Sequence, residues 1–187
     1  MEVSIITINY NSSEYTINLV KSILAKVSSE IEYEIIITDN ASENDDYKNL
    51  IEKVPRDERI KIEKNNINTG FAGGNMNGFN NSSGKYLLFI NNDCECLNDI
   101  IQPSIYFMKN NKSVGLITGK VCGTDGKYTG THKLFPCLSK SLFGTGISRM
   151  LQKNKFVSPK KSVHEAIKVQ VVTGAFMFFD RNVFEDI

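Results

Sequence analysis

The sequence lacks three features that would place it in a specialised class: a long apolar run, an excess of one charge sign and a paired set of cysteines. None of its apolar runs approaches the roughly 18 residues that a membrane-spanning helix needs, and the N-terminus enters a strand-like run at once, without a signal peptide. Lys and Arg number 22 against 21 Asp and Glu, so the basic excess of a general nucleic-acid binder is absent. We therefore expect a cytoplasmic protein that binds no nucleic acid.

The four cysteines do not form a metal or disulfide framework. Cys94, Cys96, Cys122 and Cys137 contain no C-x-x-C pair, and the two histidines of the chain cannot complete a convincing zinc set with them. We expect all four to be reduced, as in a cytoplasmic protein.

The remaining composition is that of an ordinary folded domain, with 41% hydrophobic and 23% charged residues in 187. Short β-branched and apolar runs alternate with segments of helical periodicity. Strands are expected at 3–8, 33–38, 60–63, 86–90, 114–118, 169–172 and 176–180, and helices within 16–27, 46–53, 70–78, 99–108 and 181–187. This alternation predicts an α/β fold with a mostly parallel central sheet flanked by helices.

Two common nucleotide-binding motifs are excluded. A dinucleotide-binding unit needs G-x-G-x-x-G directly after its first strand, but residues 9–13 read NYNSS. The segment most similar to a P-loop contains Gly78, Gly84 and Lys85. It does not match the motif, because the glycine spacing is wrong, Tyr86 stands in place of Ser or Thr, and a strand follows in place of the helix.

Polar residues instead follow the ends of successive predicted strands, at 7–11, 39–40 and 91–93. In an open parallel sheet, ligands bind beyond the carboxyl ends of the strands. Asp39 could accept hydrogen bonds from a base or a ribose, and Asp93 with Glu95 offers oxygen ligands for a divalent ion that holds a diphosphate. Asp and Asn are also ordinary turn residues, so each position taken singly has that simpler explanation.

Four strand-end segments together resemble family 2 glycosyltransferases, and most closely their rhamnosyltransferase-like branch. They are VSIITINYN at 3–11, IITDNAS at 36–42, NTGFAGGN at 68–75 and FINND at 89–93. A fifth segment, TGAFM at 173–177 with Arg181 and Phe184 after it, is similar to the later G-A-x-M segment of that branch. The resemblance implies a GT-A fold, a dTDP- or UDP-sugar donor, a Mg²⁺ or Mn²⁺ ion, and inversion at the anomeric carbon.

The same resemblance assigns roles to individual residues. Asp93 matches the conserved carboxylate of the D-x-D motif and would bind the metal, with Glu95 as a less certain helper, whereas Asn91 stands where many members have the first Asp. The donor-binding residues that it implies are Thr7, Asn9, Tyr10, Asp39, Asn68, Gly70, Phe71, Asn75 and Asn92.

The chain departs from the family pattern after the G-A-x-M segment. The G-x-F-D-E stretch and the acidic E-D-x-D motif that supplies the catalytic base are absent before Ile187. We therefore expect no catalytic base within this chain, and no transfer by it alone. The expected division is a donor-binding half at 1–121, a basic loop or flap at 122–166 and the start of an acceptor-side segment at 167–187.

Residues 126–164 contain eight Lys or Arg and no Asp or Glu. This stretch is either a basic flap that contacts the inner face of the cytoplasmic membrane or a lipid-linked acceptor, or a solvated loop. The leading interpretation is an inverting, metal-dependent glycosyltransferase of polysaccharide assembly, with rhamnose as the leading sugar and a saccharide or lipid-linked acceptor. A nucleotidyltransferase and a non-catalytic module that binds nucleotide sugars are the alternatives.

Overall fold

The computed structural model describes residues 1–133 and 166–186. Two compact units divide the chain, one formed by Met1–Ile117 with Gly174–Ile187 and the other by Thr118–Thr173. The first unit contains a six-stranded sheet and its helices. It also contains every residue to which the sequence analysis assigns donor or metal binding.

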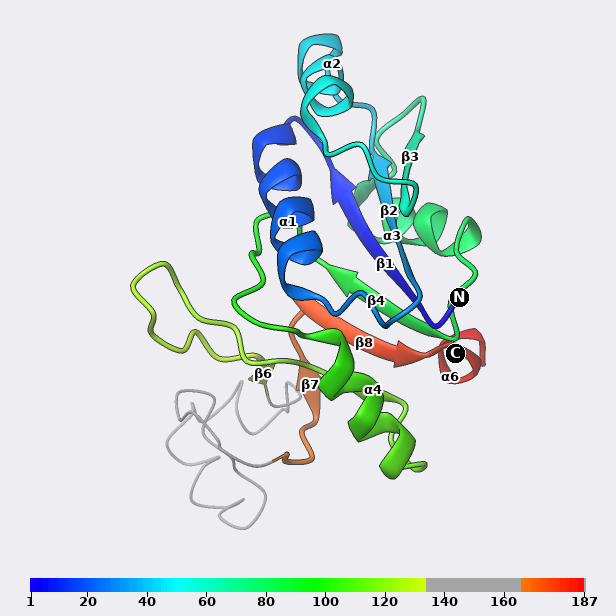
Figure 1. The fold of residues 1–187 in the computed structure, drawn as a ribbon, viewed down its shortest axis with the longest axis vertical. Coiled ribbons are helices and arrows are strands. Elements are labelled where there is room, and N and C mark those ends of the chain that lie inside the picture. Colours follow the sequence, from blue (N-terminus) through cyan, green and yellow to red (C-terminus); the bar gives the residue numbers. More distant parts are fainter. Residues whose placement is uncertain (134–165, 187) are drawn as a thin grey trace, which may run out of the picture. The chain divides into compact units, whose positions relative to one another are not determined.

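The sheet of the first unit is parallel in one half and antiparallel in the other. Its strands, in spatial order, are β3 (Ile60–Lys64), β2 (Tyr33–Asp39), β1 (Val3–Asn9), β4 (Tyr86–Ile90), β8 (Phe176–Asp180) and β5 (Leu116–Ile117). The first four run parallel, whereas β8 lies antiparallel to β4 (Figure 1). Strand β8 is antiparallel to β5 as well. The chain leaves β1 for β2 on one side and later adds β4 on the other, so strand order reverses between β1 and β4.

The central strands are buried on both faces because helices cover each side of the sheet. The helices are α1 (Ser13–Lys26), α2 (Asn44–Lys53), α3 (Gly70–Asn80), α4 (Ile101–Asn110) and α6 (Arg181–Glu185). One core cluster joins Ile5 and Ile35 of the sheet to α1 and α4, and a second joins Ile6 and Ile36 to aromatic residues of α3 and α6. Continuous apolar runs such as those of β1 and β2 are typical of strands covered on both faces.

Helix α3 lies unusually close to the sheet through two glycines one turn apart. A Cβ atom added to Gly78 would lie 2.4 Å from Cγ2 of Ile6, and one added to Gly74 would lie 2.9 Å from Cδ1 of Ile8. The glycine-rich segment therefore serves helix–sheet packing as well as the turn before the helix.

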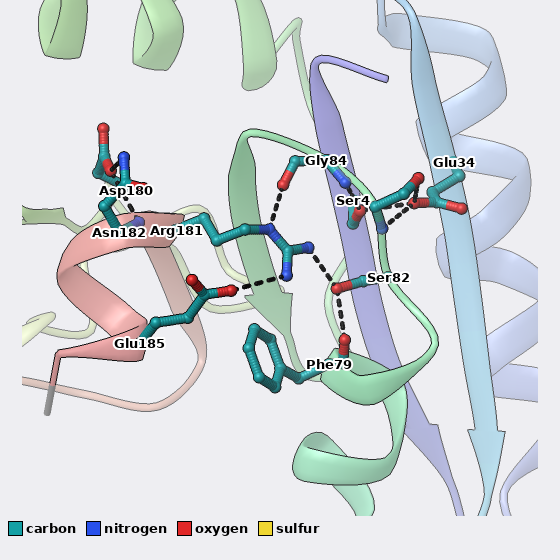
Figure 2. A network of polar contacts seen from close by, with 10 residues as sticks. Ser4, Glu34, Phe79, Ser82, Gly84, Asp180, Arg181, Asn182 and Glu185 are labelled. Carbon is teal, nitrogen blue, oxygen red and sulfur yellow. Dashed lines mark hydrogen bonds and ion pairs between the residues drawn. The ribbon is translucent and has the colours of Figure 1, made fainter.

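The loop between α3 and β4 is held from two sides. The side chain of Glu34 on β2 accepts hydrogen bonds from the backbone and the hydroxyl of Ser83, both at 2.8 Å. From the opposite side Arg181 donates to the carbonyl of Gly84 and to the hydroxyl of Ser82, both at 2.6 Å (Figure 2). The segment that follows β8 thus fixes a loop about a hundred residues earlier in the chain.

We predict that Arg181→Met lowers the free energy of unfolding by about 2 kcal/mol, because two partly buried acceptors lose a charged donor. Urea denaturation of the purified variant would measure the loss. Glu185→Gln is the matched control: its carboxylate lies 3.4 Å from Arg181 but is half exposed, so its removal should change stability by no more than about 0.5 kcal/mol. Equal losses in the two variants would contradict this assignment.

The predicted α/β fold is confirmed, with each expected strand and helix of the first unit present. Two details differ. The strand expected at 114–118 is reduced to Leu116–Ile117, because it lies at the sheet edge and, within the described part of the chain, pairs with β8 alone. The strand at 176–180 enters the parallel sheet in the opposite direction.

The second unit is described in part. Its strands β6 (His132–Lys133) and β7 (Val171–Val172) pair antiparallel. The basic stretch at 126–164, interpreted either as a flap that contacts a membrane or an acceptor or as a solvated loop, lies mostly within 134–165, outside the described residues. Within the described part of the chain, no helix has the length and apolar character needed to cross a bilayer.

Candidate functional site

A cavity of about 330 Å³ opens at the carboxyl ends of β1 and β4, where strand order reverses. This is the position at which open α/β sheets bind their ligands. Its described lining comprises Ile8, Tyr10, Ser12, Asn40, Asn68, Gly70, Phe71, Asn75, Phe89, Ile90, Asn91, Asn92 and Asp93. Amide side chains and aromatic rings therefore dominate the wall.

Behind the β1 edge of the cavity lies a buried polar cluster centred on Asn9. Its amide nitrogen donates to carboxylate oxygens of Asp39 and Asp46, each at 2.9 Å, and to the Ser42 hydroxyl at 3.1 Å. Burial alone would raise the pKa of Asp46, but hydrogen bonds from the backbone of Ser13, from Asn9 and from the Ser13 hydroxyl outweigh it and lower that pKa. Asp46 is therefore held as a carboxylate, which can only accept hydrogen bonds.

Asn40 fastens the loop before α3 to the end of β2. Its amide nitrogen donates to the Asn68 side chain at 2.8 Å and to the Gly70 carbonyl at 3.1 Å. Its carbonyl oxygen accepts from the Asn65 side chain at 2.9 Å and from the backbone and hydroxyl of Thr69. Because Asn40 is almost fully buried and its polar groups are occupied, we assign it to holding the cavity wall in shape.

The β4 edge of the cavity carries the one charged residue among the described lining residues, Asp93. Its side chain is exposed, and no group of the described chain donates a hydrogen bond to it. Burial, and then the negative charge of Asp93, raise the pKa of the neighbouring Cys94 thiol to about 11. Cys94 therefore stays a thiol at neutral pH, and Asp93 is the group free to bind a cation.

Two aromatic rings and a helix N-terminus complete the wall. Tyr10 is 48% exposed and Phe71 is 56% exposed, so both can stack against a flat or apolar ligand group. Gly70 and Phe71 form the first turn of α3, and Gly70 has a φ of 72°, which favours glycine. The Gly70 N–H is already donated to the Asn68 side chain at 2.8 Å, so it is the positive end of this helix dipole that favours an anion in the cavity.

The structure brings most of the predicted binding residues together. Tyr10, Asn68, Gly70, Phe71, Asn75, Asn92 and Asp93 line the cavity. Thr7, Asn9 and Asp39 are fully buried and do not line it, and the exposed Glu95 lies outside the lining as well. Direct contact of these four with a ligand stays a prediction.

The structure adds Ser12 to the wall and gives Asn40, predicted only as part of the polar strand end 39–40, a place of its own there. The position of Asn40 directly after a strand, next to Asp39, was the available signal. No cluster of three or more His, Cys, Asp or Glu that could hold a metal occurs among the described residues. An ion bound at Asp93 would thus need further ligands of another kind, from neutral oxygens or from a second molecule.

Comparison with known proteins gives one family. Residues 4–187 match the model of Glycosyl transferase family 2. The putative teichuronic acid biosynthesis glycosyltransferase TuaG of Bacillus subtilis is 28% identical over 63% of this chain and 46% of its own length. The chain spans between 18% and 46% of the length of the curated relatives it matches.

Solved structures show the same fold. Residues 1–349 of S. aureus TarS superpose with a TM-score of 0.61 and 16% identity, covering 100% of this chain and 49% of that one, and TarS has also been solved with UDP-GlcNAc. The mannosyltransferase PcManGT of Pyrobaculum calidifontis, in complex with GDP-Man and Mn²⁺, superposes with a TM-score of 0.65 and 14% identity, covering 99% of this chain and 46% of that one.

Proposed function

Because this chain belongs to glycosyltransferase family 2, with the GT-A fold, we propose that it forms the nucleotide-sugar donor site of a transferase in cell-surface polysaccharide assembly. The relative TuaG supports a cell-wall polysaccharide, and TarS and PcManGT support a sugar nucleotide as donor. The cavity between β1 and β4 is the proposed donor site.

The observation that carries this proposal is the charge pattern of the cavity. Asp93 faces a cavity that the N-terminus of α3 also enters, and no Lys, Arg or His stands among its described lining residues. A diphosphate placed there would be attracted by the helix N-terminus and repelled by Asp93. A divalent cation held by Asp93 would turn this repulsion into attraction, so the residues fit a Mg²⁺ or Mn²⁺ ion that binds together with the nucleotide.

The other residues of the cavity wall can then be assigned contacts to the donor. Tyr10 and Phe71 offer exposed rings for the base or the sugar, and the amides of Asn68 and Asn75 offer polar contacts to hydroxyl groups. The cation at Asp93 would neutralise the departing diphosphate during inverting transfer. We propose a UDP- or dTDP-sugar as donor and, from the family resemblance alone, rhamnose as the sugar.

The acceptor is proposed to be a saccharide or a lipid-linked saccharide. Asp93 is the one carboxylate among the described lining residues, and it is assigned to the cation. A base for the acceptor hydroxyl is therefore proposed to come from outside the described cavity wall.

Calorimetric titration of the full chain with UDP, dTDP and GDP, each with and without Mn²⁺, tests the donor site. At least one nucleotide should bind, and Mn²⁺ should tighten its binding by about 100-fold, the upper part of the usual range for coupled ligands. The preferred nucleotide identifies the donor class. Absence of binding by all three at millimolar concentration with Mn²⁺ would overturn the proposed function.

A further inference from the structure

The orientation of Asn9 is dictated by two carboxylates. Carboxylates accept hydrogen bonds and cannot donate them, so the NH₂ group of Asn9 must face Asp39 and Asp46, from which its nitrogen lies 2.9 Å away in each case. The carbonyl oxygen of Asn9 consequently points in the other direction, toward Thr16 on α1. No other assignment of the amide satisfies all of these atoms.

The orientation of Asn9 in turn fixes the hydrogen bonds that Thr16 forms with Asn92 in the cavity wall. A hydroxyl has one proton, and that of Thr16 is donated to the carbonyl oxygen of Asn9 at 2.8 Å. Toward Asn92, whose amide nitrogen lies 3.0 Å away, the Thr16 oxygen can therefore only accept. The nitrogen of Asn92 also donates to the Ser12 hydroxyl at 2.7 Å.

Asn92 thus donates both amide protons, one to Thr16 of α1 and one to Ser12, the N-cap residue of α1. The side-chain carbonyl oxygen of Asn92 receives no hydrogen bond from the described chain. It stands in the cavity wall beside Asp93. Of its polar side-chain atoms, the carbonyl oxygen is therefore the one left for a ligand, and this oxygen can serve a cation or a hydroxyl but not a phosphate oxygen.

We propose that the chain of contacts from Asp39 and Asp46 through Asn9 and Thr16, called here the relay, fixes Asn92 as a second, neutral oxygen ligand beside Asp93 for the divalent cation. This inference rests on the proposed function, because it assigns the ligands of the cation in the donor site. Thr16 is a positioning residue that acts through Asn92. Thr16 is buried and lies 7 residues from Asn9 in sequence. Through Asn9, the two carboxylates, which do not line the cavity, fix the direction in which the Thr16 hydroxyl donates its proton.

Thr16→Val tests the relay, because it removes the hydroxyl and keeps the shape of the side chain. The quantity to measure is the ratio of nucleotide dissociation constants without and with Mn²⁺. Loss of an outer contact that orients a metal ligand typically lowers metal affinity by about tenfold or more, so we expect this ratio to fall about tenfold in Thr16→Val while metal-free binding stays unchanged. Thr16→Ser, which restores a hydroxyl, should recover the ratio.

Thr38→Val is the matched control. Thr38 is also a fully buried threonine, but its hydroxyl has no hydrogen-bond partner, so the same substitution removes no contact. The ratio should stay at the wild-type value. A second readout needs no nucleotide: exchange of the Asn92 side-chain amide protons, followed by NMR, should be slow in wild type and Thr38→Val and faster in Thr16→Val.

The outcomes separate the inference from the proposed function. Wild type that binds no nucleotide overturns the proposed function, and with it the ligand role of Asn92, whereas the NMR measurement still decides whether the relay exists. Wild type that binds, with an unchanged ratio in a folded Thr16→Val, overturns the relay. If Thr16→Val does not fold, Asn92→Ala decides, because a wild-type ratio in that variant would remove Asn92 from the cation.

Discussion

Asp93→Asn is expected to abolish the effect of Mn²⁺ on nucleotide binding, so that the affinities with and without the metal become equal. The physical reason is linkage: a cation that tightens nucleotide binding by about 100-fold must itself be bound about 100-fold more tightly when the nucleotide is present. Both effects need the one carboxylate of the described lining that faces the cavity. A neutral amide keeps the shape of the side chain and removes the charge that attracts the cation.

Calorimetric titration with and without Mn²⁺ measures this effect. Asp45→Asn is a matched control, since it makes the same chemical change on an exposed residue of α2 and should leave the metal effect intact. Glu95→Gln adds a sharper comparison. Because Glu95 does not line the cavity, we expect a wild-type metal effect in that variant, and a loss there would make Glu95 the helper that the family resemblance suggested. A retained metal effect in Asp93→Asn would contradict the assignment.

Glu34→Gln is expected to lower the free energy of unfolding at pH 7 by about 3 kcal/mol. The Glu34 side chain is 1% exposed, and its carboxylate accepts from Lys61 at 2.7 Å, from the Ser4 hydroxyl at 2.7 Å and twice from Ser83 at 2.8 Å (Figure 2 shows the Ser4 contact). Glutamine can keep its oxygen toward Ser4 and Ser83, but its NH₂ group then faces the Lys61 ammonium where Oε2 had accepted, so the buried charge and its ion pair are lost.

The loss of unfolding free energy in Glu34→Gln should become smaller at low pH. Burial alone would raise the pKa of Glu34, but the hydrogen bonds from Lys61, Ser4 and Ser83 outweigh it and hold the pKa at about 2, below the ordinary value of 4.5. A carboxyl whose pKa is lowered by folding contributes its full stabilisation above its unfolded value, and that stabilisation is lost as the pH falls toward the folded value. The difference between wild type and Glu34→Gln should therefore be constant above pH 4.5 and shrink toward pH 2.

Urea denaturation over this pH range would measure the difference. Glu32→Gln is the control, because Glu32 is 82% exposed and forms only a 3.7 Å ion pair with the N-terminus; its removal should change stability by about 0.5 kcal/mol or less. A pH-independent difference between wild type and Glu34→Gln would show that the buried charge is not the cause.

The parts of the fold that sequence analysis predicted are those in which local pattern and burial agree. The runs at β1, β2 and β4 are apolar on both faces because helices cover both faces, and their bounds were predicted to within a residue. The antiparallel direction of β8 could not be predicted from its sequence. Phe176 and Phe178 are buried whichever way the strand runs, and its direction is decided by pairing with β4, about 90 residues earlier.

Some residues of the candidate site could likewise be predicted from the sequence, and others could not. Tyr10, Phe71 and Asp93 follow strand ends or a glycine-rich turn, and so their place at the cavity could be predicted. The roles of Asn40 and Thr16 could not, because each depends on partners brought near only by folding: Asn40 contacts residues 25 to 30 positions away, and Thr16 contacts Asn92 across 76. Sequence type identifies a residue that can bind a ligand, whereas the tertiary contacts decide whether its polar atoms are already occupied.

The antiparallel insertion of β8 between β4 and β5 also bears on the order of folding. Among the residues that the structure describes, β5 pairs in the sheet with β8 alone, and β4 has an open edge until residues 176–180 are added. During synthesis the parallel half can pair first, while the apolar edge of β4 waits for a segment translated about 90 residues later. Long-range strand pairing is slow and exposes edges to wrong partners. Pulse-labelled amide exchange should accordingly show protection in β1 and β2 before β5 and β8.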